Sequence, residues 1–284
     1  MPSVLVLGAQ GMLGRAVSAQ LRAAGLDVRA PARTEFDARR DDPAALLVGI
    51  DCAVNAIGIL RSRIDEVGRE AAFEVNAAFP HRLTEAARVG GARIIHVTTD
   101  AVFTGTGGAP YDESAPHDAT DVYARSKSEG EVDAPHVVNL RCSIVGPEPP
   151  PGRSLLAWLL GQPRGARVDG YANHRWNGLT TLHLARLIRA AIEGVALPNV
   201  LHVVPADAVT KAELLALLAR AFGRDDLEIV PVEAPQAVDL RLATVHPEAL
   251  AALWRAAGYA EPPTIAGMVR ELASKGGRAK TDPD

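Results

Sequence analysis

The beginning of the chain carries the pattern that most constrains its fold. Residues 3–7 form a short apolar run, and residues 15–24 have a helical composition that Gly25 can end. The turn between these two segments reads Gly8-Ala9-Gln10-Gly11-Met12-Leu13-Gly14. A buried strand, a turn with glycines at these three positions and a helix are together typical of a dinucleotide-binding unit. The sequence therefore predicts a doubly wound parallel α/β sheet (Rossmann).

Each glycine of this turn has an expected role. Gly8 allows the tight turn, Gly11 lets the backbone approach a pyrophosphate, and Gly14 lets the helix pack closely on the strand. The start of the helix would offer unpaired N–H groups to the phosphates. Gln10, Met12 and Leu13 of the same turn are expected cofactor contacts. A tight turn that binds no ligand is the alternative.

The segment after the second predicted strand, residues 27–30, decides between NAD and NADP. An acidic residue there binds a ribose 2′-hydroxyl, whereas an arginine accepts a 2′-phosphate. Arg33 lies nearer the expected position, and Asp37 follows slightly later. The sequence therefore favours NADPH over NADH, although Arg33 is also compatible with an ordinary solvated loop.

The first half continues as alternating strands and helices. Strands are expected at residues 52–58, 93–97 and 136–142, and helical segments at 42–48, with Asp42 as N-cap, and at 64–89. The first of these strands ends in Asn55-Ala56-Ile57-Gly58, whose small residues leave room for a ligand. Asn76 lies among apolar residues and is either a core polar group or a cofactor contact. The alternation supports the parallel sheet.

Tyr123 and Lys127 are four residues apart at a predicted helix start, so their side chains share one helix face. A nearby ammonium stabilises a phenolate and lowers its pKa toward the range in which it can exchange protons. Thr98-Thr99-Asp100 follows the strand at 93–97, and a hydroxyl there could bond a substrate carbonyl. The sequence predicts a proton-donating site, with an ordinary exposed helix turn as the alternative.

The second half is expected to hold a substrate-binding lobe. Residues 146–152 are rich in Pro and Gly and mark the exit from a dinucleotide domain at 1–150. Residues 151–274 would form the lobe, with elements that can interleave, and 275–284 a disordered tail. Residues 171–180 read as a polar, aromatic loop in which Arg175 and Trp176 could contact substrate. Other expected elements are helices at 154–160, 181–193, 210–221, 246–257 and 264–273, and strands at 201–204 and 228–232.

Composition excludes several classes of function. The 284 residues carry a net charge of −4 with scattered basic residues, which gives no support for nucleic-acid binding. No apolar run is long enough to span a membrane, so no membrane partner and a cytoplasmic location are expected. Cys52 and Cys142 read as buried free thiols. The eight histidines show no metal-ligand spacing, and no metal is expected.

Taken together, the motifs resemble the extended short-chain dehydrogenase/reductase family, and most of all its dTDP-4-dehydrorhamnose reductase branch. Their order and spacing cover nearly the whole N-terminal half of the chain. The motifs that carry the resemblance are Gly8-x-x-Gly11-x-x-Gly14, Asn55-Ala56-Ile57-Gly58, Glu74-Val75-Asn76, the run from Thr98 to Gly105, Tyr123-x-x-x-Lys127 and the run from Leu140 to Gly146.

The resemblance implies a reduction of the 4-keto group of a nucleotide-linked deoxysugar. Tyr123 would protonate the C4 oxygen, Lys127 would lower the tyrosine pKa and hold the nicotinamide ribose, and Thr99 would bond the keto oxygen. It implies cofactor contacts from Asn76 and from Thr98, Tyr123 and Lys127, and substrate contacts from the loop Asp100-Ala101-Val102-Phe103.

Two departures from the family pattern bear on the substrate. The branch usually has a tyrosine where this chain has Ala101, which changes the sugar pocket. Because Ala101 also follows Asp100 where dehydratases have a second acid, a 4,6-dehydratase is disfavoured. An NDP-sugar epimerase with retained NAD(P) and a non-catalytic NADP-binding regulatory subunit remain alternatives. The sugar, the nucleotide, the stereochemistry at C4 and the oligomeric state, for which a homodimer is one option, stay open.

Overall fold

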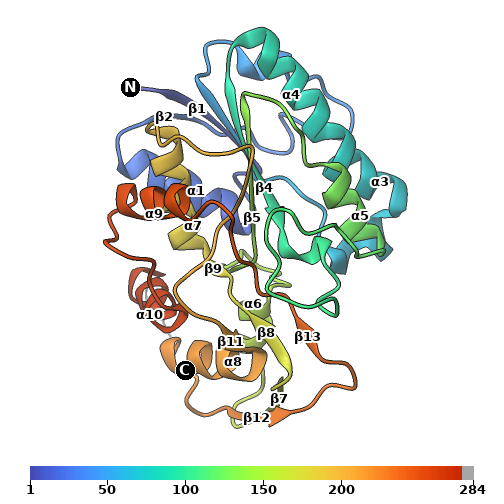
Figure 1. Cartoon of the computed structure of the whole chain (residues 1–284), viewed down its shortest axis with the longest axis vertical. Helices are drawn as coiled ribbons and strands as arrows, with labels where there is room; N and C mark the ends of the chain where they lie inside the picture. Colours follow the sequence, from blue (N-terminus) through green and yellow to red (C-terminus); the bar gives the residue numbers. More distant parts are fainter. Residues whose placement is uncertain (277–284) are drawn as a thin grey trace.

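The computed structural model describes residues 1–276, and its main body is a six-stranded sheet in which all neighbouring strands are parallel. This confirms the expected parallel α/β architecture (Figure 1). In spatial order the strands are β2 (Asp27–Arg29), β1 (Ser3–Leu7), β3 (Cys52–Asn55), β4 (Arg93–Thr99), β5 (Val137–Cys142) and β10 (Val200–His202).

The sheet is apolar on both faces because helices cover both. Along β1, Val4 and Val6 belong to one core cluster, and Leu5 and Leu7 belong to the other. The helices on the left of the sheet in Figure 1 are α1 (Met12–Ala23), α7 (Thr181–Ile192) and α9 (Pro247–Ala256). Those on the right are α3 (Arg69–Phe73), α4 (Phe79–Gly90) and α5 (Val122–Glu129), with a π-helical turn, η3 (Glu74–Ala78), between α3 and α4.

The strand order reverses at β1, which has β2 on one side and β3 on the other. In sheets of this kind, ligands bind outside the carboxyl ends of the strands at such a switch point. The glycine-rich turn after β1 and the small residues after β3 therefore meet at one edge of the sheet.

The chain returns to this sheet after it has entered the smaller lobe. Both α7 and β10 come from beyond residue 150, and β10 pairs with β5 at the sheet edge. Helix α7 packs against α1. Two elements that follow residue 150 therefore belong to the sheet and its helix layer.

The smaller lobe lies at the bottom of Figure 1 and contains short strands and helices. Ser154 and Thr210 cap α6 and α8 as expected, each accepting a hydrogen bond from a backbone N–H of the first turn. The elements are β6 (Ile144–Val145), α6 (Leu155–Leu160), β7 (Arg167–Tyr171), β8 (His174–Trp176), β9 (Leu179–Thr180), β11 (Val209–Thr210), α8 (Lys211–Ala221), β12 (Glu228–Val232), β13 (Val238–Asp239) and α10 (Ile265–Gly276).

Three expectations about local structure need correction. Residues 171–180 are not a loop, because β7 ends there and β8 and β9 lie within it. The helix expected at 42–48 is only a 3₁₀ turn, η1 (Ala44–Leu47), although Asp42 accepts a hydrogen bond from the Ala44 N–H. The disordered tail expected at 275–284 is wrong for its first two residues, because α10 runs to Gly276; residues 277–284 lie outside the described residues.

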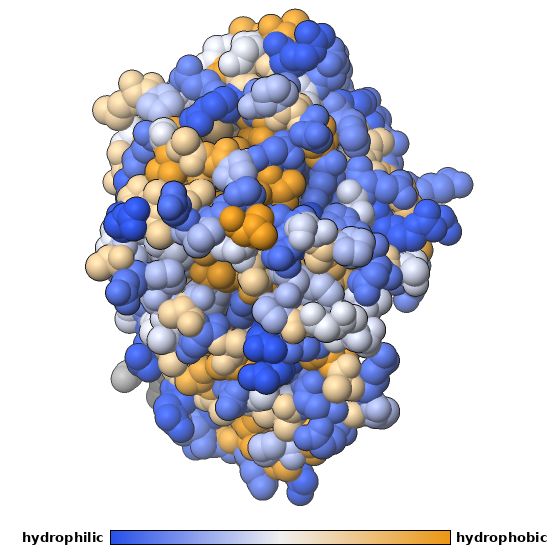
Figure 2. All heavy atoms as spheres, in the orientation of Figure 1, coloured by the Kyte–Doolittle hydropathy of each residue, from blue (hydrophilic) through white to orange (hydrophobic). Residues whose placement is uncertain are grey.

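Both cysteines are buried free thiols, as expected. Among the described helices, none combines the length and the apolar character that a membrane crossing requires. On the face drawn in Figure 2, hydrophobic atoms lie in several separate groups among hydrophilic side chains.

Candidate functional site

The turn after β1 can be built only with glycines at two of its positions. Gly8 has a φ of +80°, and a Cβ on it would lie 2.8 Å from the Ala56 carbonyl oxygen. A Cβ on Gly14 would lie 2.1 Å from the Gly8 carbonyl oxygen. The turn, α1 and the end of β3 are therefore in backbone contact. Gly11 is the N-cap of α1 and makes no side-chain cap, so the N–H groups of the first helical turn have no side-chain partner there.

A cavity of about 340 Å³ opens at this turn. Its size lies in the range of small-molecule sites, and the backbone around the two glycines leaves space for a pyrophosphate. The structure brings together eight of the expected cofactor contacts in its wall: Gly8, Gln10, Gly11, Arg33, Asp37, Ala56, Ile57 and Gly58. The residues present thus fit a dinucleotide cofactor.

The acidic residue in this wall already has a cationic partner. Both carboxylate oxygens of Asp37 accept hydrogen bonds from the Arg39 guanidinium, at 2.6 to 3.2 Å. This pairing holds the pKa of Asp37 far below its usual range. Arg39 and Arg63 also line the cavity, and the sequence analysis missed both. Their only sequence signal was a local excess of arginine, which is also typical of solvated loops.

Two asparagines expected at the cofactor instead shape the cavity wall. The Asn55 side chain accepts a hydrogen bond from the Ile57 N–H at 3.1 Å and contacts His96. Asn76 binds both backbone groups of Ile59, accepting from its N–H at 2.7 Å and donating to its carbonyl at 3.0 Å. Both side chains are buried, so they fix the turn after β3.

Three further expected cofactor contacts lie outside the cavity wall. Leu13 is buried in the core on the α1 side of the sheet. Met12 begins α1 but does not line the cavity. Thr98 is buried, and its hydroxyl donates to the Glu131 carboxylate at 2.9 Å. Thr98 therefore serves the packing of β4.

Tyr123 and Thr99 are brought together at the carboxyl end of β4. Burial and the negative charge of Asp100 raise the pKa of the Tyr123 phenol, whereas the nearby Thr99 hydroxyl and the charge of Arg61 lower it. The Thr99 hydroxyl donates to Asp100 at 3.2 Å. The phenol is therefore protonated at neutral pH, as a proton donor must be.

Lys127 lies on α5 one turn after Tyr123, and its ammonium contacts the backbone of β4. It is 4% exposed, and its Nζ donates to the Val97 carbonyl at 3.0 Å. Burial lowers the pKa of Lys127 to about 8. The charge of Arg61 acts to lower the pKa of Tyr123, and the expected effect of Lys127 on this pKa stays a prediction.

The residues of the loop after Thr99 differ in what surrounds them. Asp100 is buried, and burial raises its pKa against opposing effects of Lys211, Thr99 and Ser143. Ala101 is half-buried, and its N–H donates to the Thr99 hydroxyl. Val102 and Phe103 form a small core with Tyr111 and Leu242, which places them in the interior rather than in the expected substrate wall.

The two expected substrate residues of β8 differ in their surroundings. Arg175 is exposed, and its charge acts on Asp239 of the neighbouring strand β13. Trp176 is 3% exposed and lies under Lys211, whose Nζ is 5.4 Å from the ring centroid. Lys211 also faces Asp100, because each charge shifts the pKa of the other. No sequence motif points to Lys211, which lies at the start of an ordinary helix.

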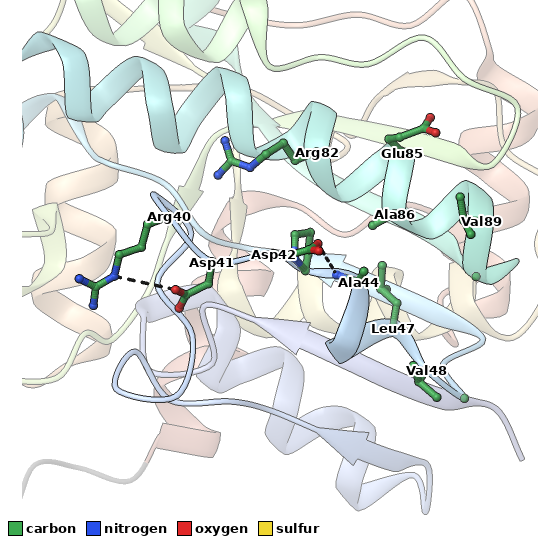
Figure 3. Close-up of a pocket in the computed structure, with 13 residues that line it drawn as sticks. Arg40, Asp41, Asp42, Ala44, Leu47, Val48, Arg82, Glu85, Ala86 and Val89 are labelled. Atoms are coloured by element: carbon green, nitrogen blue, oxygen red, sulfur yellow. Dashed lines mark hydrogen bonds and ion pairs between the residues drawn. The ribbon is translucent and has the colours of Figure 1, made fainter.

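A larger surface hollow, of about 770 Å³, lies between η1 and α4 (Figure 3). Arg82, Glu85, Ala86 and Val89 of α4 face the segment from Arg40 to Gly49 across it. It contains none of the expected site residues and does not touch the glycine-rich turn. The smaller cavity is therefore the candidate cofactor site.

Comparison with known proteins agrees with this geometry. Residues 2–241 match the family model described as RmlD substrate binding domain. The chain is 30% identical over 246 residues to a dTDP-4-keto-6-deoxy-D-glucose reductase of Streptomyces niveus, covering 80% of this chain and 81% of the relative. It is 29% identical over 258 residues to a dTDP-4-dehydrorhamnose reductase of Streptomyces griseus, covering 81% and 79%.

Solved structures show the same fold. A dTDP-4-dehydrorhamnose reductase of Bacillus anthracis in complex with NADP superimposes with a TM-score of 0.78 at 17% identity, covering 96% of this chain and 99% of the other. MoeE5 in complex with UDP-glucuronic acid and NAD gives a TM-score of 0.73 at 18% identity, with the same coverage.

Proposed function

Because this chain belongs to the RmlD substrate binding domain family, we propose that it reduces the 4-keto group of a nucleotide-linked deoxysugar with NADPH. The observation that carries the proposal is the position of Thr99, at the carboxyl end of β4, beside the start of α5, on which Tyr123 lies. Two hydroxyl groups directed at one position can bind and protonate a carbonyl oxygen. The cavity at the glycine-rich turn supports the nicotinamide cofactor.

In the proposed mechanism the cofactor supplies the hydride, and the chain supplies orientation and a proton. The Thr99 hydroxyl turns from Asp100 to the keto oxygen and donates to it. Tyr123 then transfers its phenolic proton to that oxygen as negative charge develops there, leaving a phenolate. Asp121 caps α5 by accepting from the Tyr123 and Ala124 N–H groups, which fixes where the phenol lies.

Replacement of Tyr123 with Phe tests this role. We expect kcat for reduction of dTDP-4-keto-6-deoxy-D-glucose, or of related 4-keto sugar nucleotides, to fall by about 100-fold or more, with unchanged NADPH affinity. The loss of NADPH absorbance measures turnover, and fluorescence titration measures binding. Tyr171→Phe, at an exposed tyrosine, is the matched control. Turnover at a normal rate in Tyr123→Phe would refute the mechanism, and turnover without net NADPH consumption would indicate an epimerase.

The preference for NADPH is proposed from the arginines of the cavity wall. Arg33 is available for a 2′-phosphate, whereas the carboxylate of Asp37, which could otherwise bind a ribose hydroxyl, is paired with Arg39. We expect Arg33→Ala to raise KM for NADPH by roughly tenfold and to leave KM for NADH nearly unchanged. Arg88→Ala, which removes an exposed arginine of α4, is the control. Equal losses with both cofactors would contradict the assignment.

We further propose that the enzyme works in the cytoplasm as a homodimer on a dissolved nucleotide sugar, without nucleic-acid or membrane partners. The scattered basic residues and the net charge of −4 support this setting. Size-exclusion chromatography with light scattering tests the dimer, and a mass of one chain at micromolar concentration would exclude it.

A further inference from the structure

A guanidinium from the loop after β3 lies over the ring of Tyr123. Arg61 begins the short helix η2 (Arg61–Arg63), and its guanidinium carbon is 5.7 Å from the centroid of the phenol ring. The same side chain donates to a carboxylate oxygen of Asp121 at 2.9 Å. Arg61 thus contacts both the ring and the residue that begins α5.

Asp121 accepts hydrogen bonds both from the first turn of α5 and from the Arg61 guanidinium. Its Oδ1 accepts from the N–H groups of Tyr123 and Ala124, at 3.0 and 3.2 Å, and its Oδ2 accepts from Arg61. The capping geometry needs Oδ1 only, which leaves Oδ2 free to position a cation. One carboxylate therefore fixes the distance between the phenol and the guanidinium.

Other charged groups also surround the phenol. Lys127 lies one helical turn after Tyr123, and its Nζ donates to the Val97 carbonyl, whereas Asp100 and Asp121 act in the opposite sense to a cation. On the elements packed against α5, Glu74 of η3 pairs with Arg82, and Arg69 of α3 lies over Phe73. The exposed Glu70 of α3 carries the remaining charge of that helix.

We propose that Arg61 is a positioning residue of the reduction, which stabilises the Tyr123 phenolate as the phenolic proton leaves. In that step the Tyr123 O–H bond breaks and a new O–H bond forms at the former keto oxygen, while the hydride forms the C–H bond. The negative charge left on the phenol lies next to the guanidinium until solvent returns a proton. The inference rests on the proposed role of Tyr123.

The test is the pH dependence of Arg61→Met in both reaction directions. The alcohol product of the forward reaction and NADP⁺ serve as substrates for the reverse direction, in which the phenolate must act as a base. We expect the apparent pKa of the reverse reaction to rise by about half a pH unit, because Arg61 is a largely exposed charge near the phenol. The forward kcat should fall about threefold with little change in KM.

Three comparisons make the result specific. Arg125→Met removes an exposed cation of α5 that pairs with Glu129, and it should leave the pH profile unchanged. Arg61→Lys should keep the apparent pKa of the reverse reaction close to the wild-type value, because it keeps the charge. If Tyr123→Phe retains turnover, the proposed function fails. If Tyr123→Phe is inactive but Arg61→Met leaves the pH profile unmoved, or raises only KM, the inference on Arg61 alone is overturned.

Discussion

The buried ammonium of Lys127 destabilises the folded protein. Its ammonium is buried with one backbone acceptor, and burial lowers its pKa to about 8 from 10.5. The unfolded chain therefore binds this proton more tightly than the folded chain does. The contribution of Lys127 to the free energy of unfolding is therefore most unfavourable below pH 8, and it becomes less unfavourable as the pH rises from about 8 toward 10.5.

Lys127→Met should consequently stabilise the protein. We expect the free energy of unfolding at pH 7 to increase by about 1 to 3 kcal/mol, with the difference shrinking toward pH 10. Urea unfolding at several pH values measures this. A variant less stable than the wild type at pH 7 would show that the bond to Val97 outweighs the burial of the charge.

Gly14 is constrained by backbone that cannot move aside. A Cβ there would lie 2.1 Å from the Gly8 carbonyl oxygen. Gly14→Ala should lower the free energy of unfolding by about 2 kcal/mol or more and weaken NADPH binding, because the turn must open. Gly90→Ala is a matched control near the end of α4, where the nearest atoms are 3.9 Å from the added Cβ. That change should be neutral or slightly stabilising. Equal effects at the two positions would contradict the close-packing account.

At the scale of elements, local chemistry sets where several helices begin. Thr210 forms a capping box with Glu213 at the start of α8: its hydroxyl accepts from the Glu213 N–H at 3.1 Å, and the Glu213 carboxylate accepts from the Thr210 N–H at 2.7 Å. Because Lys211 is the first residue of this helix, the cap also determines where that ammonium lies.

Thr210→Ala should lower the free energy of unfolding by about 1 kcal/mol, because it leaves the first-turn N–H groups without a side-chain acceptor. Thr210→Ser keeps the hydroxyl and should cost little. Thermal unfolding of the two variants gives the comparison, and similar losses in both would assign the effect to the methyl group.

The elements that could be predicted from the sequence are those with a local signal. The strand, turn and helix at the N-terminus and the caps at Ser154 and Thr210 follow from residue types within a few positions of each other. By contrast, β8 pairs with β13, some 60 residues later in the sequence. A strand of three residues depends on its pairing partner more than on its own residue types. The local sequence of β8 therefore predicts a loop.

Only part of the candidate site could be predicted from the sequence, for a similar reason. Glycines and the Tyr123–Lys127 spacing are read directly from the sequence, whereas Arg39, Arg61 and Lys211 look like ordinary surface charges until the fold places them. The position of the Lys127 ammonium depends on the Val97 carbonyl, 30 residues earlier in sequence, which no helix pattern reveals.

At the scale of the whole molecule, a buried ionic network ties the sheet edge to the loops that cross it. Arg141 of β5 pairs with Glu131 and contacts His202 of β10. Glu113 accepts from the His202 N–H at 2.7 Å and from the Thr244 hydroxyl at 2.6 Å. Segments from four parts of the chain therefore meet in one polar network, with the buried Arg141–Glu131 ion pair as part of it.

Glu131→Gln should destabilise the protein by about 3 to 5 kcal/mol, because it leaves the Arg141 guanidinium buried without its counter-ion. Glu129→Gln, at an exposed residue two positions earlier, should change stability by less than about 0.5 kcal/mol. Although burial alone would raise it, hydrogen bonding and charge pairing with Arg141 hold the pKa of the Glu131 carboxyl below its ordinary value of 4.5. The stability that this ion pair contributes is therefore present above pH 4.5 and is lost as the pH falls through the pKa of the folded state. The difference between wild type and Glu131→Gln should therefore narrow in acid.

The return of the chain to the sheet edge determines how the protein can be divided. A fragment that stops near residue 150 would lack β10, which covers the open edge of β5, and α7, which covers α1. Such a truncation would expose an unpaired strand beside apolar helix surface, a combination that promotes aggregation. The cofactor half therefore cannot be cut out by a single break, and exchange of lobes between relatives would require two junctions around α7 and β10.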